Sequence, residues 1–331
     1  MSGSSGAAGA ASGGAAGAAG GGAGVCPAGI TGTPALGGTP VRVSSVPPPD
    51  AFNMNDGTFG NVEGPVWLGD ALYVSEMSAT SYDSQNPGVV RSRILKVTPD
   101  GQTTIAVSDS GSNGLAVDRN GDIVAAVHKD GTLTRFPRTG GAPMILVDGY
   151  LGARFNAPND LAIHSNGTIY LSDPNYQAPS TRPQAQTRVY RIPAGGAPEP
   201  IPSSASPDTF TTPNGVTLSL REDFLYVAAA TGRRYPVMAD GTLGAGEDFA
   251  AASRGDGMVV DCAGNLYVAR GGNVVVYTAA GSMLGSIGVP EVQSVTNVAF
   301  GGADRRTLYI TGLGDEKGLF QIPLTIPGRP Y

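Results

Sequence analysis

Six residues with oxygen-bearing side chains recur along the chain, and each stands at the start of an apolar run. These lead residues are Glu63, Asn113, Asn159, Asn214, Asp256 and Thr296, and successive ones are 40 to 55 residues apart. None of them is Lys, Arg, His or Cys. Carboxylates, amide carbonyls and water are the ligands that Ca²⁺ prefers, whereas Zn²⁺ prefers His or Cys. Gathered at one point, the lead residues would suit a hard divalent cation.

The repeat that carries these residues predicts the fold. After the first lead residue comes Leu72-Tyr-Val74, and the same second run returns as Leu225-Tyr-Val227 and Leu266-Tyr-Val268. In five of the units a further pair of short strands follows, joined by an Asp-Gly or Gly-Gly turn. A repeat of this length with four short strands is typical of a propeller blade. We therefore predict an all-β fold, a six-bladed β-propeller with four antiparallel strands per blade.

One strand lies outside the complete repeats. Residues 40–46 alternate as a strand does, yet they precede the first unit, while the sixth unit offers only three strands. Because a closed ring leaves no exposed edge, we expect this N-terminal strand to complete the last blade. We assign residues 1–39 to a disordered tether, since the first 25 are almost entirely Gly, Ala and Ser, and residues 40–331 to the propeller.

Propeller geometry brings a second set of residues to the same face. The inner strands begin beside the axis, so the lead residues converge, and the second strands end there. We expect Asn113, Asp173 and Arg270 to bind substrate, and His128 to act in catalysis. The alternative is that each makes only local hydrogen bonds, with Arg270 pairing a carboxylate such as Glu76. Likewise, polar lead residues can line a solvent-filled channel that binds nothing.

Four motifs at blade spacing resemble those of the SMP-30/gluconolactonase family, which contains six-bladed, metal-dependent lactonases and related esterases. They are Glu63-Gly-Pro-Val-Trp67, Phe155-Asn-Ala-Pro-Asn-Asp160 with Ser172-Asp-Pro-Asn-Tyr176, Pro213-Asn-Gly215 and Asp256-Gly-Met258. The resemblance covers about residues 50–320. It implies that Glu63, Asn159, Asn214 and Asp256 hold a divalent cation, usually Ca²⁺, with Mg²⁺, Mn²⁺ and Zn²⁺ as alternatives.

The site predicts hydrolysis of a lactone or a similar ester. Asp256 is the candidate general base or nucleophile, because it is the lead carboxylate other than Glu63. Asp160 is a further catalytic candidate, which could instead orient the neighbouring Asn159. A calcium-dependent phosphotriesterase or arylesterase could share this site. From another class, the rival is an exported propeller without catalytic activity that binds a carbohydrate or a protein.

Composition restricts the partners. The net charge is −6 and the sequence pI is near 4.9, which argues against nucleic acid and anionic membrane surfaces, because both attract clustered Lys and Arg. No apolar run approaches the roughly 20 residues of a membrane span. We therefore expect a small-molecule lactone or ester as the partner. We also expect a monomer, since a closed propeller has no edge strand to pair.

The chain has two cysteines, Cys26 and Cys262. If the N-terminal strand completes the last blade, Cys26 comes near blade five, which carries Cys262. A disulfide between them is our expectation, and two free thiols are the alternative. Gly/Ala tethers commonly follow an export or lipid-anchor signal, although the chain as given shows none. We therefore expect a periplasmic, cell-surface or secreted protein, with the cytoplasm as the alternative.

Overall fold

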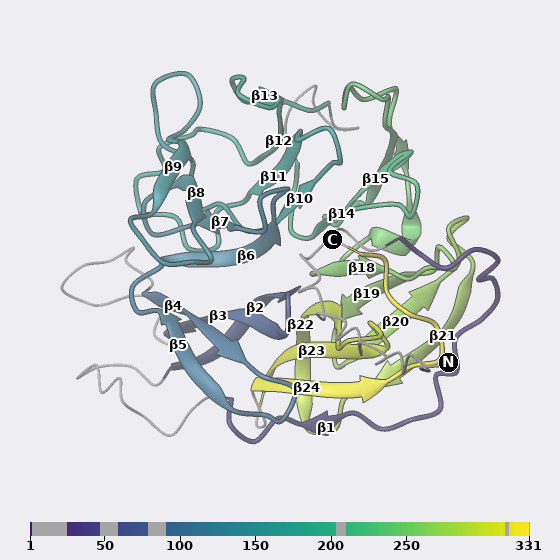
Figure 1. Cartoon of the computed structure of the whole chain (residues 1–331). Helices are drawn as coiled ribbons and strands as arrows, with labels where there is room; N and C mark the ends of the chain where they lie inside the picture. Colours follow the sequence, from purple (N-terminus) through teal and green to yellow (C-terminus); the bar gives the residue numbers. More distant parts are fainter. Residues whose placement is uncertain (2–24, 47–58, 79–90, 203–209, 315–317, 331) are drawn as a thin grey trace.

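Six four-stranded antiparallel sheets form a ring in the computed structural model of the chain (Figure 1). The structure describes residues 1, 25–46, 59–78, 91–202, 210–314 and 318–330. Each inner strand lies next to the inner strand of the following blade, and the sixth lies next to the first. The predicted six-bladed propeller is confirmed.

The first three blades follow the chain in order. They contain β2 (Phe59–Leu68), β3 (Ala71–Ser78), β4 (Ser92–Val97) and β5 (Thr103–Val107); β6 (Ser112–Val117), β7 (Ile123–Val127), β8 (Thr132–Phe136) and β9 (Met144–Val147); and β10 (Leu161–Ile163), β11 (Ile169–Asp173), β12 (Arg188–Ile192) and β13 (Glu199–Pro200).

The last three blades complete the ring. They contain β14 (Val216–Leu218), β15 (Phe224–Val227), β16 (Arg233–Pro236) and β17 (Glu247–Asp248); β18 (Met258–Val260), β19 (Leu266–Arg270), β20 (Asn273–Tyr277) and β21 (Met283–Gly288); and β22 (Val292–Gly301), β23 (Thr307–Gly314), β24 (Gly318–Pro323) and β1 (Val41–Arg42). Apart from one short 3-10 helix, η1 (Ala250–Ala252), the described residues contain no helix. In this part of the chain, therefore, no helix has the length and apolar character to cross a membrane.

The N-terminal strand closes the ring as expected. β1 pairs antiparallel with β24, with Val41 opposite Gln321, and the amide of Val43 donates to the carbonyl of Leu319 at 2.8 Å. The strand is shorter than predicted, because regular pairing stops after Arg42. Blade six thus takes one strand from the opposite end of the chain, which joins the two ends across a single sheet.

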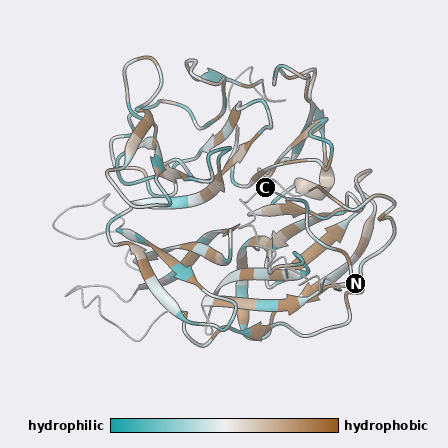
Figure 2. Ribbon diagram, in the orientation of Figure 1, coloured by the Kyte–Doolittle hydropathy of each residue, from teal (hydrophilic) through white to brown (hydrophobic). Residues whose placement is uncertain are grey.

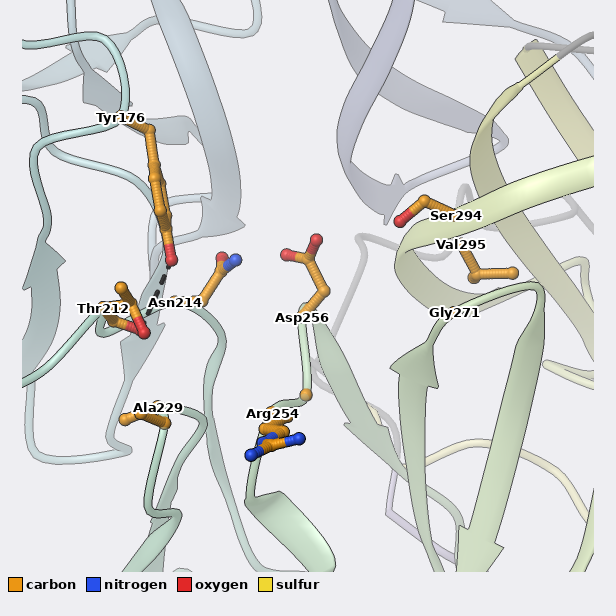
Figure 3. A pocket seen from close by; sticks show the side chains of 11 residues that line it. Tyr176, Thr212, Asn214, Ala229, Arg254, Asp256, Gly271, Ser294 and Val295 are labelled. Atoms are coloured by element: carbon orange, nitrogen blue, oxygen red, sulfur yellow. Dashed lines mark hydrogen bonds between the residues drawn. The ribbon is translucent and has the colours of Figure 1, made fainter.

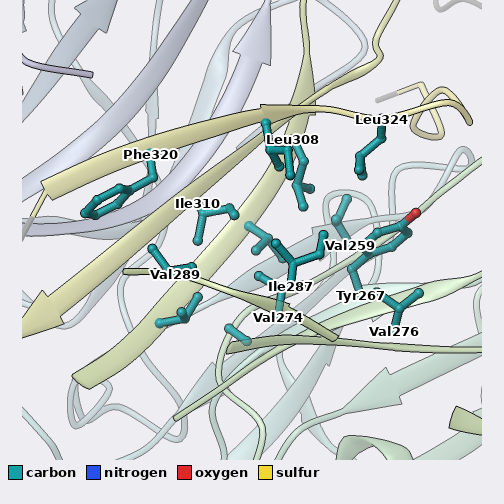
Figure 4. Close-up of a cluster of buried hydrophobic side chains, with 14 of the residues drawn as sticks. Val259, Tyr267, Val274, Val276, Ile287, Val289, Leu308, Ile310, Phe320 and Leu324 are labelled. Carbon is teal, nitrogen blue, oxygen red and sulfur yellow. The ribbon is translucent and has the colours of Figure 1, made fainter. Parts of the chain in front are cut away.

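The hydrophobic core is divided among the interfaces between neighbouring blades. Each of six clusters of buried side chains draws residues from two adjacent blades. Figure 4 shows the cluster between blades five and six, which contains Tyr267 and Val276 of blade five and Ile310 and Phe320 of blade six. The strongest hydrophobic colour in Figure 2 runs along the strands. Alternating apolar residues on both faces of each sheet therefore hold the blades in a fixed order around the axis.

The chain lies against the propeller before β1. Leu36 packs against the cluster between blades five and six, and the side-chain amide of Asn265 donates to the carbonyl of Gly32 at 3.0 Å. The structure joins Cys26 to Cys262 in a disulfide, with the two Cα atoms 5.5 Å apart. Residues 25–39, which the sequence analysis placed in the tether, are thus held along blades five and six. Residues 2–24 of that predicted tether lie outside the described residues.

Candidate metal and substrate site

The lead residues lie where the regular pairing of the inner strands is interrupted. In blades one, two and six the register shifts at Glu63, Asn113 and Thr296. In blades three, four and five the lead residue comes two positions before the strand begins. A bulge or the start of a strand changes the direction in which a side chain points. The lead residues therefore need not point alternately to the two faces of the sheet, as residues in a regular strand do. We had expected all six to begin an inner strand, but three lie within one.

Backbone contacts join the lead segments to one another around the axis. The amide of Gly114 donates to the carbonyl of Asn159 at 2.7 Å, and the amide of Gly257 donates to the carbonyl of Thr296 at 2.8 Å. The hydroxyl of Thr296 donates to the carbonyl of Val62 at 3.1 Å, which links blade six to blade one. The lead residues are therefore positioned by the closed ring rather than by their own strands.

Glycine follows the lead residue in four of the blades because the segments approach closely. Gly64 has φ of +53°, and a Cβ built there would lie 2.3 Å from the carbonyl oxygen of Asn113. No side chain fits at that distance. The glycine therefore allows Glu63 and the segment of Asn113 to lie side by side.

We expect Gly64→Ala to destabilise the protein by about 2–4 kcal/mol, because it adds a steric clash to an unfavourable φ. Gly101→Ala is the matched control: Gly101 also has positive φ, +81°, but a Cβ there meets nothing within 4 Å. Urea unfolding of both variants tests this. Equal losses of unfolding free energy would show that only φ matters at Gly64, and that the close approach does not exist in solution.

Three carboxylates lie near one another at the axis, and burial raises the pKa of each. Burial, aided by Asp160, raises the pKa of Glu63 to about 7, and burial raises that of Asp160 to about 7. The pKa of Asp256 is raised well above its ordinary value by burial first, and then by Glu63 and Asp160. The charged groups that act on Asp256 are thus other carboxylates. A divalent cation would relieve this repulsion.

The donor set fits a hard cation. In the described part of the chain no three His, Cys, Asp or Glu side chains are grouped to hold an ion by themselves. The four candidate ligands are two carboxylates, Glu63 and Asp256, and two amides, Asn159 and Asn214. This mixture of oxygen donors suits Ca²⁺ and carries just enough charge to neutralise a dication.

A cavity of about 390 Å³ opens beside two of these ligands, Asn214 and Asp256. In Figure 3 their side chains point toward one another, and Ser294 faces Asp256 from the far wall. The hydroxyl of Tyr176 donates to the carbonyl of Thr212 at 3.3 Å. Burial, followed by the nearby charge of Asp256, raises the pKa of Tyr176. The cavity therefore offers hydroxyl, amide and carboxylate groups to a small polar molecule.

Sequence reasoning missed Arg254, Thr212 and Ser294 in the cavity wall. Each stands two positions before a lead residue, namely Asp256, Asn214 and Thr296. The spacing of two residues from a lead residue is the feature of the sequence that could have identified these three residues.

Asp160 holds blades three and four together. Its carboxylate accepts the amide of Leu161 at 2.9 Å and the amide of Val216, the first residue of β14, at 3.0 Å. Val216 is two residues after Asn214, so Asp160 positions the start of blade four. We predicted that Asp160 acts in catalysis or orients its neighbour Asn159; the structure adds that both of its oxygens accept backbone amides.

Four other residues expected at the pocket do not line this cavity. Asp173 is fully buried, and its carboxylate accepts the amides of Asn156 and Ala157 at 3.0 and 2.8 Å. His128 is 1% exposed and Asn113 2% exposed. Asp173 therefore fastens the loop that leads into Asn159, whereas His128 and Asn113 are buried outside the lining of this cavity.

Arg270 also lies away from the cavity. Its guanidinium donates to the hydroxyl of Tyr277 at 2.7 Å and to the carbonyl of Ala251 at 2.6 Å. Glu76, the partner we had considered for it, instead forms a buried ion pair with Arg93 at 2.5 Å. Position at the end of a second strand therefore does not predict which residues line the cavity, because hydrogen bonds and ion pairs with neighbouring segments hold these side chains elsewhere.

Comparison with known proteins identifies the family of the chain. The model of the SMP-30/Gluconolactonase/LRE-like region matches residues 61–314. The chain belongs to this family. A gluconolactonase of Zymomonas mobilis is 28% identical over 273 residues, which is 75% of each chain.

Two solved structures place the chain within the same fold. A gluconolactonase of Xanthomonas campestris superposes with a TM-score of 0.61 and 26% identity, covering 83% of this chain and 99% of that one. Regucalcin of Agrobacterium tumefaciens, described as a calcium-binding protein, superposes with a TM-score of 0.62 and 20% identity, covering 83% and 94%. At that identity regucalcin supports the propeller fold alone.

Proposed function

We propose that this member of the SMP-30/gluconolactonase family is a lactonase that hydrolyses small sugar lactones with the help of a bound Ca²⁺ ion. The family membership and the gluconolactonase relative support the reaction class. The observation that carries the proposal is the meeting of Glu63, Asn214 and Asp256 at the axis, with Asn214 and Asp256 lining a cavity.

The chain's own groups account for binding and proton transfer. Glu63, Asn159, Asn214 and Asp256 would hold the cation, which when bound would polarise the lactone carbonyl and lower the pKa of water. Asp256 faces the cavity, and a carboxylate in that position can act as a general base. It would accept the proton of the attacking water. Tyr176 and Ser294 would hydrogen-bond the hydroxyl groups of a sugar lactone.

Hydrolysis of a substrate panel tests this proposal. The panel contains an aldonolactone, an aliphatic lactone, an aryl ester and a phosphotriester, each assayed after EDTA treatment with and without added Ca²⁺. We expect the aldonolactone to be hydrolysed fastest, with activity lost to EDTA and restored by Ca²⁺. A faster phosphotriester would favour the phosphotriesterase alternative. No hydrolysis of any member, with no Ca²⁺-dependent rise in melting temperature, would favour a binding protein.

The cluster of Glu63, Asp160 and Asp256 also predicts how the stability of the metal-free protein depends on pH. Folding raises the pKa values of Glu63 and Asp160 to about 7, so the protonated forms are favoured in the folded state. Their contribution to stability is complete below the unfolded values near 4 and is lost as the pH rises through about 7. We therefore expect the melting temperature of the metal-free protein to fall by several degrees between about pH 5 and pH 8.

Added Ca²⁺ should oppose this fall, because it competes with protons for the same oxygens. The rise in melting temperature on adding Ca²⁺ should therefore be larger at pH 8 than at pH 5. Differential scanning calorimetry in EDTA and in Ca²⁺ measures both curves. Glu63→Gln should flatten the metal-free curve, and an unchanged slope in this variant would show that the cluster does not titrate as described.

A further inference from the structure

The wall of the cavity contains one cation among the described residues, Arg254. Its guanidinium has no hydrogen-bond or ion-pair partner in the described part of the chain, in contrast to Arg233, Arg234 and Arg270 nearby. The side chain is exposed, and it comes two residues before the candidate ligand Asp256. An arginine that is left unpaired beside a polar cavity is available to a ligand.

The backbone of Arg254 is held in an unusual conformation. Its φ is +53°, and the amide donates to the carbonyl of Ala229, another residue of the cavity wall, at 2.7 Å. Thr212 occupies the equivalent position before Asn214 and has φ of +50°. Glycine would adopt this conformation at lower cost. Strained backbone conformations of residues other than glycine are concentrated at functional sites. A large charged residue in this conformation therefore points to a role for its side chain.

The charges in the cavity favour an anion near Arg254. Asp256 is the one carboxylate among the described residues of the wall, and a dication at the axis would offset its charge, which leaves the guanidinium as the excess charge of the wall. Arg pairs best with carboxylates through two parallel hydrogen bonds. Arg254 and Asp256 line the same cavity of about 390 Å³, so one short sugar acid can contact both side chains.

We propose that Arg254 selects lactones that carry a free carboxylate at the end remote from the lactone carbonyl. This inference rests on the proposed lactonase function and specifies its substrate class. The substrate would place its carbonyl near Asp256 and Asn214, and its carboxylate on the guanidinium of Arg254. The net charge of the whole protein, −6, repels such an anion. The attraction between the substrate carboxylate and the guanidinium of Arg254 therefore has to exceed this long-range repulsion.

Two lactones that differ only at the far end test the proposal. D-Glucono-1,4-lactone ends in a hydroxymethyl group, and D-glucaro-1,4-lactone ends in a carboxylate. We expect the wild type to favour the carboxylated lactone. Arg254→Gln should lower kcat/KM for that lactone by about 10–100-fold, the value of a charge-assisted hydrogen bond, and change the neutral lactone by less than about 2-fold.

Matched variants separate recognition from other effects. Arg221→Gln removes the same charge from an exposed residue outside the cavity wall, and should leave the ratio of the two lactones unchanged. Arg254→Gly removes the charge and also relieves the strain of the positive φ. This variant should lose the preference for the carboxylated lactone and melt no lower than the wild type. If Arg254→Gln slows both lactones equally or slows neither, the residue does not select the carboxylate and the proposal fails.

Binding of the products gives a readout that does not depend on hydrolysis. Isothermal titration calorimetry with D-glucarate and D-gluconate, in the presence of Ca²⁺, should show weaker glucarate binding to Arg254→Gln and unchanged gluconate binding. If the wild type hydrolyses neither lactone, the proposed lactonase function fails, and this titration still decides the role of Arg254. Equal glucarate affinity in the wild type and Arg254→Gln would overturn it.

Discussion

Asp256→Asn is expected to lower kcat/KM for lactone hydrolysis by about 10²–10⁴-fold, the range that a positioned acid–base group contributes. The substitution keeps the shape of the side chain but removes its proton acceptor and half of the ligand charge. Glu63→Gln should cause a loss of similar size, because the site then lacks a charge that the cation requires. Steady-state rates with saturating Ca²⁺ measure both variants.

The folded structure should survive these two substitutions. In the absence of metal, each removes one of three carboxylates that repel one another, so in EDTA the variants should melt at or above the temperature of the wild type. Glu199→Gln serves as the control, because Glu199 lies on the outer strand β13 and pairs with Arg191 at 2.9 Å. Full activity in both Asp256→Asn and Glu63→Gln would rule out this site.

Loss of the disulfide between Cys26 and Cys262 is expected to cause the largest change in stability. The bridge closes a segment of 236 residues that contains most of the ring. The chain-entropy model gives an upper value of about 5–6 kcal/mol for a loop of this size, and loss of a native disulfide typically costs about 2–5 kcal/mol. The double variant Cys26→Ala/Cys262→Ala should therefore melt about 5–8 °C lower than the wild type, measured by calorimetry without reductant.

Reductant provides the internal control for the disulfide. Dithiothreitol should lower the melting temperature of the wild type to that of the double variant and leave the double variant unchanged. Lactone hydrolysis at 25 °C should persist in both, because neither cysteine lines the cavity. A wild type that is insensitive to reductant would show that the bridge does not form in solution. The bridge also supports our proposal that the protein is exported to an oxidising compartment.

The sequence by itself determined the architecture. Six repeats of paired apolar runs, five of them followed by a second pair of short strands, required six blades, since the period of the pattern is a local property of each strand and turn. The incomplete sixth unit and the early strand at residues 40–46 required the closure of the ring by β1. The lead residues were identifiable as well, because each stands at the start of an apolar run that belongs to an inner strand, and the inner strands bring Glu63 and Asp256 to the same axis.

The tertiary structure decided which side chains face the cavity. Asp173, Arg270 and Glu76 end or flank second strands and were equal candidates in the sequence, but hydrogen-bond partners on other segments direct them elsewhere. Arg254 enters the wall because a left-handed backbone, held by the carbonyl of Ala229 in the neighbouring blade, leaves its side chain unpaired. The direction of a side chain at the end of a strand depends on contacts between blades, which no local pattern encodes.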